Sequence, residues 1–216
     1  MLAGGALVAD RMLPSPLERL SSVSTLVLDR DQRVLRAYTT ADGAWRLPVD
    51  LAQIDPKFMR FLLAYEDQRF RTHPGVDVLA AGRATWQAAS HGRIVSGAST
   101  LTMQLARLME PSPRTLGAKL AEMGRALQIE QRLSKDEILG AYLTFAPYGG
   151  NLEGVRAASL AYFGKEPRRL TDAEAALLVA LPQAPETVRP DRFPQAAKSA
   201  RDKVLRLMQE RGLVEV

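Results

Sequence analysis

The sequence predicts a mainly helical domain with a small β-hairpin near its N-terminus. Two aliphatic, β-branched runs early in the chain suggest the hairpin, and apolar residues recur at helical spacing from Pro56 onward. The composition is typical of a globular protein, because 46% of the 216 residues are hydrophobic and 25% are charged. This length suits one domain, or two small lobes that share a core.

The hairpin is expected over residues 23–28 and 33–39, with the letters "DRDQ" between the two runs. The first nine residues, "MLAGGALVA", are apolar, but a helix needs about 20 such residues to cross a bilayer. We interpret residues 1–21 as an N-terminal segment, which could be what is left of a membrane anchor, a signal fragment or a buried start. Residues 22–216 then form the folded domain.

The first helix is predicted to begin just after Asp55. Its apolar residues lie at i, i+3, i+4 and i+7 and are Phe58, Phe61, Leu62 and Tyr65. A second helix is expected over residues 77–89. Ser99 is a suitable cap for a third helix that ends near Met109, where "EPSPRT" breaks the pattern.

The later helices are predicted from an apolar stripe and from capping boxes. The stripe, which we expect to face the core, consists of Leu116, Leu120, Met123 and Leu127. The boxes are the pairs Ser134 with Glu137 and Thr171 with Glu174. A proline-rich connector, "LPQAPETVRPDRFP", precedes a last helix from about Gln195 to Arg211.

Charge and cysteine content narrow the functional classes. The net charge of +5 and the pI of about 9.7 indicate anionic partners such as nucleic acid, phospholipid surfaces or phosphorylated substrates. Cysteine is absent, which excludes a disulfide scaffold and cysteine-ligated zinc. Aromatic residues make up only 6% and fall mostly at helix-core spacing, so a nucleic-acid-binding module is the weaker interpretation.

Glu66 and Asp67 are the first candidate catalytic residues, because they end the apolar helical run "FLLAY". An apolar wall beside a carboxylate can tune its proton affinity for acid or base catalysis. A solvated pair of charges at a helix end is the alternative. His73 lies in the turn "HPG", and we expect it to close that turn by bonding to the backbone or to a carboxylate.

A loop-to-helix junction within "GRIVSGASTLTMQLARL" is the second candidate, with Ser99, Thr100, Gln104 and Arg107. Helix N-termini present free N–H groups that suit phosphate oxygens. An ordinary capped helix is the alternative, and the GK[ST] letters of a Walker loop are missing.

Lys119 and Glu122 are the third candidate, since residues three apart share a helical face. The pair could bind an anionic leaving group, directly or through a cation such as Mg²⁺. A surface ion pair is the alternative.

These stretches occur in an order that resembles a known family. They are "EDQRFRTHPGVD", "GASTLTMQ", "KLAE", "SKDEILGAYL", "YFGK", "LPQAP" and "ARDKVLRLM". They are similar to the motifs of the peptidoglycan glycosyltransferase domain of class A penicillin-binding proteins, glycosyltransferase family 51. The first corresponds to EDxxFxxHxGxD, the second to GxSTxTQQ and the third to the end of RKxxE. The resemblance covers about residues 22–210.

The resemblance implies a lysozyme-like, two-lobed glycosyltransferase domain over residues 22–216, with a jaw lobe that faces the membrane. Residues expected on the membrane side of the jaw are Trp86, Arg93, Ile94, Val95, Leu105 and Arg107. It implies action at the outer, periplasmic face of the bacterial cytoplasmic membrane. Its partners would be lipid II, the growing glycan strand, the membrane surface and other cell-wall synthesis proteins, with no nucleic acid.

The resemblance also assigns roles to individual residues. Glu66 and Glu122 would be catalytic, with Glu66 the general base and Glu122 the ligand of a divalent cation, Mg²⁺ or Mn²⁺. The substrate-binding residues would be Asp67, Phe70, His73, Ser99, Thr100, Gln104, Arg107 and Lys119. Three positions depart from the family pattern: Met103 replaces a Gln, Ala118 an Arg and Thr144 an Asn.

The reaction implied is the inverting displacement of undecaprenyl pyrophosphate from one lipid II by a hydroxyl of another. Such a leaving group is already anionic, so it needs cations and N–H donors. A lysozyme-like hydrolase or lytic transglycosylase is the alternative function, but it must protonate an alcohol leaving group and has no use for a cationic phosphate site.

Overall fold

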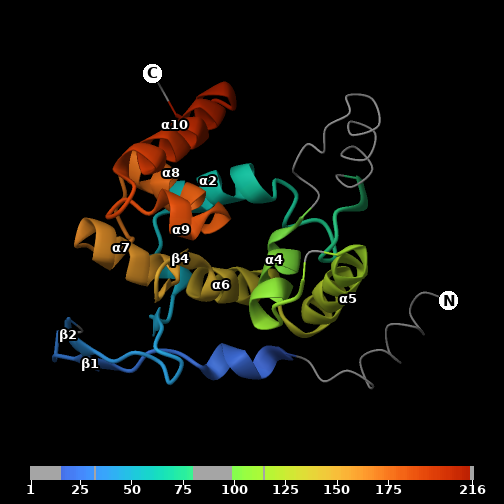
Figure 1. Ribbon diagram of the computed structural model, residues 1–216, viewed down its shortest axis with the longest axis horizontal. Coiled ribbons are helices and arrows are strands. Elements are labelled where there is room, and N and C mark those ends of the chain that lie inside the picture. The colour runs from blue at the N-terminus through green and yellow to red at the C-terminus, as the bar shows by residue number, and fades with distance from the viewer. Residues whose placement is uncertain (1–15, 32, 80–98, 114, 215–216) are drawn as a thin grey trace. The chain divides into compact units, whose positions relative to one another are not determined.

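The computed structural model describes residues 16–31, 33–79, 99–113 and 115–214 (Figure 1). The chain forms two compact units. One comprises Met1–Arg19 and Glu66–Tyr142, and the other comprises Leu20–Tyr65 and Leu143–Val216. We call them the catalytic unit, because it contains all the candidate catalytic residues, and the second unit. The prediction of a mainly helical chain is confirmed, and its division agrees with two small lobes.

The predicted hairpin is confirmed in the second unit, where β1 (Leu26–Leu28) pairs antiparallel with β2 (Val34–Ala37). Asp29 closes the connection, because its carboxylate accepts hydrogen bonds of 2.8 Å from the amides of Asp31 and Arg33. An aspartate that bonds to backbone amides two and four residues further on stabilises such a turn locally.

A second sheet, which the sequence did not predict, has the order β3-β5-β4. Its strands are β3 (Trp45–Arg46), β4 (Pro147–Gly149) and β5 (Leu152–Glu153). β3 and β5 run parallel although they lie far apart in the chain. The fully buried Arg46 joins them, since its Nε donates to Glu153 Oε2 at 2.6 Å.

The helices of the second unit surround a core that includes Phe58, Phe61 and Leu62, as the spacing predicted. α8 packs against α10, and the Thr171–Glu174 capping box is formed. The helices with residues in this unit are α2 (Pro56–Glu66), whose last residue belongs to the catalytic unit, α7 (Val155–Phe163), α8 (Asp172–Ala180), α9 (Pro185–Val188) and α10 (Pro194–Glu210). The 3-10 helices are η1 (Pro16–Ser21), η2 (Leu51–Gln53) and η3 (Leu181–Gln183).

The catalytic unit is built on α4 (Leu101–Met109) and α5 (Leu116–Arg132), which pack side by side (Figure 1). α6 (Lys135–Phe145) follows, and its start is stabilised by the predicted bonds between Ser134 and Glu137. Of the helix predicted over residues 77–89, Val78 and Leu79 are helical, Asp77 is not, and residues 80–89 lie outside the described residues.

The predicted cap of α4 is wrong by one residue. Thr100, rather than Ser99, is the N-cap, and its Oγ1 accepts a hydrogen bond from the Met103 amide at 3.1 Å. The hydroxyl of either Ser99 or Thr100 could cap the helix. Thr100 also donates to the Gly75 carbonyl at 2.5 Å, and this tertiary contact determines which of the two is the cap.

The predicted core stripe of α5 is also wrong for its three leucines. Leu116, Leu120 and Leu127 are 87%, 68% and 39% exposed. The buried face instead contains the side chains of Glu122, Ala126, Gln128 and Ile129. The small Ala126 suits that face, because Gly75 can approach it closely, with the Ala126 carbonyl oxygen 2.9 Å from where a Cβ would be.

No helix within the described ranges is long and apolar enough to span a membrane. Of the residues expected on the membrane side of the jaw, Trp86, Arg93, Ile94 and Val95 lie outside these ranges. Leu105 was wrongly included, since it is fully buried on the inner face of α4.

Candidate active site

Glu66 is the last residue of α2, and α4 fixes its carboxylate. Its Oε2 accepts a hydrogen bond of 2.8 Å from Gln104 Nε2, and the Tyr142 hydroxyl bonds to Gln104 Oε1 at 3.3 Å. An ionised carboxylate can only accept hydrogen bonds. The amide nitrogen of Gln104, which is a donor, must therefore be the group that faces Glu66. Two side chains, Gln104 of α4 and Tyr142 of α6, therefore hold the candidate base at the end of α2.

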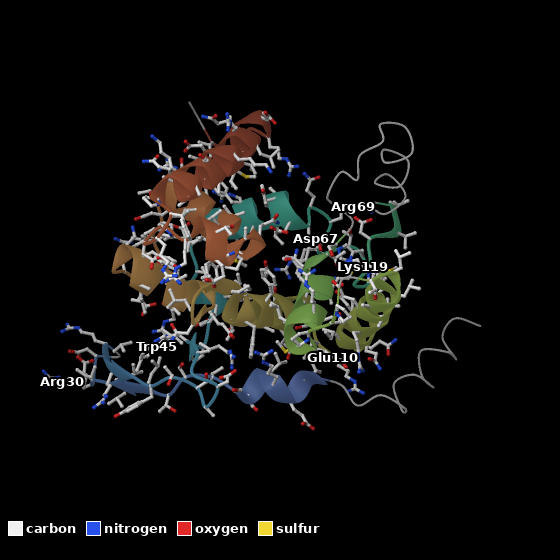
Figure 2. All side chains as sticks on the ribbon, viewed as in Figure 1. Arg30, Trp45, Asp67, Arg69, Glu110 and Lys119 are labelled. Atoms are coloured by element: carbon white, nitrogen blue, oxygen red, sulfur yellow. The ribbon has the colours of Figure 1, made fainter. Side chains whose placement is uncertain are left out.

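Asp67 and His73 form a buried pair in the same unit, and each is 7% exposed. His73 Nε2 lies 2.9 Å from Asp67 Oδ1, and the Leu101 amide donates to Asp67 Oδ2 at 3.0 Å. His73 Nδ1 accepts from the Gly75 amide at 3.2 Å, so its Nε2 carries the proton that faces Asp67. Figure 2 labels Asp67, which ties the turn after α2 to the first amide of α4.

This geometry confirms that His73 closes the turn by bonding to a carboxylate and to the backbone. A carboxylate at a helix N-terminus also interacts favourably with the helix dipole. The arrangement gives Asp67 and His73 a supporting role behind Glu66. Their direct contact with substrate stays a prediction.

Phe70 is 1% exposed and is part of the same turn. Lys135 Nζ is 4.6 Å from its ring centroid and donates to the His73 carbonyl at 2.7 Å. Glu130 Oε1 balances this ammonium at 2.6 Å and also accepts from the Thr102 hydroxyl at 2.6 Å. A cation on an aromatic face and a paired buried charge together fix the position of the turn.

Gly75 is required where the turn meets α5. Its φ is +90°, and a Cβ there would lie 2.8 Å from Glu130 Cγ and 2.9 Å from the Ala126 carbonyl oxygen. Asp77 then bonds to Arg69 through both carboxylate oxygens. The motif "EDQRFRTHPGVD" is thus mostly a structural clamp, and its first residue, Glu66, is half-buried whereas Asp67 beside it is buried.

Lys119 places a cation at the start of α4, and Figure 2 labels it on α5. Its Nζ donates to Ser99 Oγ at 2.6 Å and lies 3.3 Å from Glu122 Oε1. The Lys119 side chain is 37% exposed, whereas that of Glu122 is 6% exposed. The structure therefore joins Lys119, Ser99 and Glu122 into one cluster in which Glu122 is the buried member.

The other predicted residues occupy different surroundings. Thr100 is 3% exposed, since it caps α4. Arg107 is exposed in the last turn of α4 and forms no ion pair with any residue the structure describes. Met103, one of the departures from the family pattern, is 1% exposed in a small apolar cluster with Val76 and Ala126.

A divalent cation would find few ligands from the chain itself. Within the described ranges no group of three or more acidic or histidine side chains could hold a metal ion. Glu122 is one carboxylate, and Mg²⁺ in proteins is often held by one or two carboxylates together with substrate phosphates. Glu122 therefore fits the role of a single ligand, in competition with Lys119.

The catalytic unit thus holds a glutamate carboxylate through Gln104 and places a lysine at the start of α4, which together make a candidate enzyme site. The chain belongs to the Transglycosylase family, whose sequence model matches residues 31–209. The prediction of a peptidoglycan glycosyltransferase domain is thereby confirmed, and the hydrolase alternative is not favoured.

Individual relatives agree with this assignment. Penicillin-binding protein 1C of Escherichia coli K12 is 47% identical over 205 residues, which is 95% of this chain and 26% of that protein. Penicillin-binding protein 1A of the same organism is 40% identical, over 91% of this chain and 24% of that protein. Penicillin-binding protein 1F of Bacillus subtilis 168 is 35% identical, over 90% of this chain and 27% of that protein. The chain thus spans about a quarter of the length of these relatives.

A crystal structure of penicillin-binding protein 1A from Haemophilus influenzae is also similar to this chain. It has a TM-score of 0.48 and 21% sequence identity, and the alignment covers 90% of this chain and 19% of that one. The family assignment comes from the sequence comparisons alone.

Several residues that shape the site were not found by sequence reasoning. Tyr142 orients Gln104, and Lys135 with Glu130 supports the turn that contains Phe70. Lys135 and Tyr142 lie in "SKDEILGAYL", which pointed to the family without assigning them roles. Their partners come from other helices, so no local spacing could reveal them.

Proposed function

We propose that this domain polymerises lipid II, with Glu66 as the general base that takes the proton of the acceptor hydroxyl. The observation that carries the proposal is the 2.8 Å hydrogen bond from Gln104 Nε2 to Glu66 Oε2. A donor on a carboxylate oxygen favours the ionised form, which is the form a base needs. A hydrolase would instead need a carboxylic acid kept protonated to release an alcohol.

In the proposed reaction the acceptor hydroxyl oxygen attacks the anomeric carbon of the donor sugar. The bond from that carbon to the pyrophosphate oxygen breaks, the electron pair leaves with the pyrophosphate, and Glu66 receives the hydroxyl proton. Attack from the opposite side inverts the anomeric centre. One proton moves to the enzyme and none is needed by the leaving group.

The developing charge on the pyrophosphate needs positive partners. Lys119 supports this role, because its side chain is partly exposed and its ammonium donates to Ser99 at the start of α4. Arg107 is exposed on α4 and is the second cation in the proposal. Ala118 stands where the family has an arginine, so Lys119 carries more of this role here.

We also propose that a divalent cation, Mg²⁺ or Mn²⁺, is held by Glu122 together with the substrate phosphates. Bound there, it would supply further charge neutralisation for the pyrophosphate. The setting we propose is the outer face of the bacterial cytoplasmic membrane, with lipid II, the growing strand, the membrane surface and other cell-wall synthesis proteins as partners. Lipid II is a membrane-bound substrate, which supports that location.

The test is incubation of the domain with labelled lipid II and Mg²⁺, read for polymer against small fragments. Wild-type protein should form polymer, and Glu66→Gln should lose about 10²–10⁴-fold in rate, because an amide cannot accept the proton. Glu110→Gln is the matched control, since Glu110 is an exposed glutamate of the same unit that pairs with Arg125.

The outcomes separate the alternatives. Release of fragments from sacculi in place of polymer would support the hydrolase. Near-normal polymerisation by Glu66→Gln would remove Glu66 from the mechanism, whatever the product.

A further inference from the structure

The second unit contains a groove of about 590 Å³ that the proposed reaction does not use. One wall is the turn that includes η2 and the start of α2, and the other is the loop between α7 and α8. The lining residues that matter are Ala52, Ile54, Pro56, Lys165, Arg168 and Arg169. Its volume lies within the range of about 300–1,000 Å³ that is usual for small-ligand sites.

Asp55 ties the two walls of the groove together. Its amide donates to the Pro167 carbonyl at 2.8 Å, and its Oδ2 accepts from the Leu170 amide at 2.8 Å. Its Oδ1 accepts from the Lys57 amide at 2.8 Å at the start of α2. Because one side chain fixes both walls, the groove is preorganised and a ligand would not have to order it.

Two charged residues of the groove are already neutralised. Lys165 Nζ pairs with Glu174 at 2.7 Å, and the Glu166 carboxylate pairs with the Arg156 guanidinium at 2.8 and 2.9 Å.

Arg168 and Arg169 differ from these residues. Both are exposed, and neither forms an ion pair or hydrogen bond with a residue in the described ranges. The groove therefore keeps two adjacent guanidinium groups, and a charge of about +2, available for a ligand.

We propose that this groove binds a phosphate group, either of a soluble phosphate ester or of a phospholipid headgroup. A phosphate monoester carries about −1.5 to −2 charges at pH 7, which matches two guanidinium groups. The phosphodiester of a phospholipid headgroup carries about one negative charge, and its two free oxygens can still bind a guanidinium group. Guanidinium also binds phosphate oxygens in a bidentate geometry. Ala52, Ile54 and Pro56 give the ligand's carbon atoms an apolar surface beside the phosphate.

The experiment compares two double variants of the same charge change. Arg168→Gln with Arg169→Gln removes the two free guanidinium groups. Lys203→Gln with Arg206→Gln is the matched control, because both residues are exposed on α10. Each protein is titrated with inorganic phosphate and followed by amide NMR shifts. Each is also sedimented with phosphatidylcholine vesicles that contain or lack phosphatidylglycerol.

The expected result is a saturable shift of the amides around residues 52–57 and 165–170 with phosphate, lost in the Arg168/Arg169 variant and kept in the control. If the source is a lipid headgroup, the variant should also bind phosphatidylglycerol vesicles about tenfold or more weakly. Unchanged vesicle binding together with the phosphate shift would indicate a soluble ligand.

The proposal is overturned if neither probe responds, or if the two double variants respond alike. Polymerisation of lipid II in detergent should stay within about twofold of wild type in both variants, because the groove lies in the other unit from Glu66 and two surface charges change.

Discussion

Replacing Asp67 by Asn should destabilise the catalytic unit far more than its small chemical change suggests. Asp67 is 7% exposed and accepts from two donors, His73 Nε2 and the Leu101 amide. His73 cannot switch tautomer to help, because its Nδ1 already accepts from the Gly75 amide. An Asn has one oxygen, so its NH₂ group must face one of the two donors.

The expected cost follows from these contacts. Losing a hydrogen bond to a charged acceptor costs about 1.5–3 kcal/mol, and removing a negative charge from a helix N-terminus adds about 0.3–1 kcal/mol. The free energy of unfolding should therefore fall by about 2–4 kcal/mol. Urea unfolding followed by circular dichroism measures it, and hydrogen exchange at the Leu101 amide should accelerate in parallel.

Asp136→Asn is the matched control, because Asp136 is 66% exposed and pairs with Arg71 at the surface. It should change the free energy of unfolding by less than about 1 kcal/mol. If Asp67→Asn unfolds within about 0.5 kcal/mol of wild type, the buried Asp67–His73–Leu101 arrangement does not stabilise the site as described.

Three further predictions follow from single positions. Gly75→Ala should lower the free energy of unfolding by about 2–4 kcal/mol in urea titrations, because it combines a positive φ with contacts under 3 Å, whereas Gly43→Ala should cost only about 1 kcal/mol of backbone strain. Glu122→Gln should raise the Mg²⁺ concentration needed for half-maximal polymerisation, and excess Mg²⁺ should partly restore its rate, unlike that of Glu66→Gln. The Thr40 hydroxyl and the Arg46 guanidinium lower the pKa of Asp42 to about 2. The ionised Asp42 therefore stabilises the fold at any pH above its ordinary pKa, and this stabilisation is lost as the pH falls through the lowered pKa. The difference in stability between wild type and Asp42→Asn should therefore narrow between about pH 5 and about pH 2 in urea titrations.

Each of these has an outcome that would contradict it. Equal losses for the two glycine variants would mean that close contact at Gly75 is unimportant. Identical metal curves for wild type and Glu122→Gln would leave Glu122 a structural residue paired with Lys119. A pH-independent difference for Asp42→Asn would mean that Asp42 has the same proton affinity in the folded and unfolded chain.

The sequence by itself determined the features that depend on neighbours along the chain. The face of α2 with Phe58, Phe61 and Leu62 follows from helical spacing, and the hairpin follows from two β-branched runs around an aspartate turn. The capping boxes of α6 and α8 were predicted for the same reason. The motif order was sufficient to identify the family, and the choice of Glu66, Gln104 and Lys119 as site residues stays a prediction.

Tertiary structure alone decided which residue caps α4 and which face of α5 is buried, because the local sequence allows more than one answer to each. Ser99 and Thr100 both suit a cap, and contact with Gly75 selects Thr100. α5 has two faces that could be buried, and close packing favours the one with Ala126 over the leucine stripe.

The same holds for the support of the candidate catalytic residues. Gln104 reaches Glu66 across 38 positions of sequence, and Leu101 reaches Asp67 across 34. Local propensity contains no information about such partners, because the energy of a buried hydrogen bond depends on a donor and an acceptor that only the folded chain brings together.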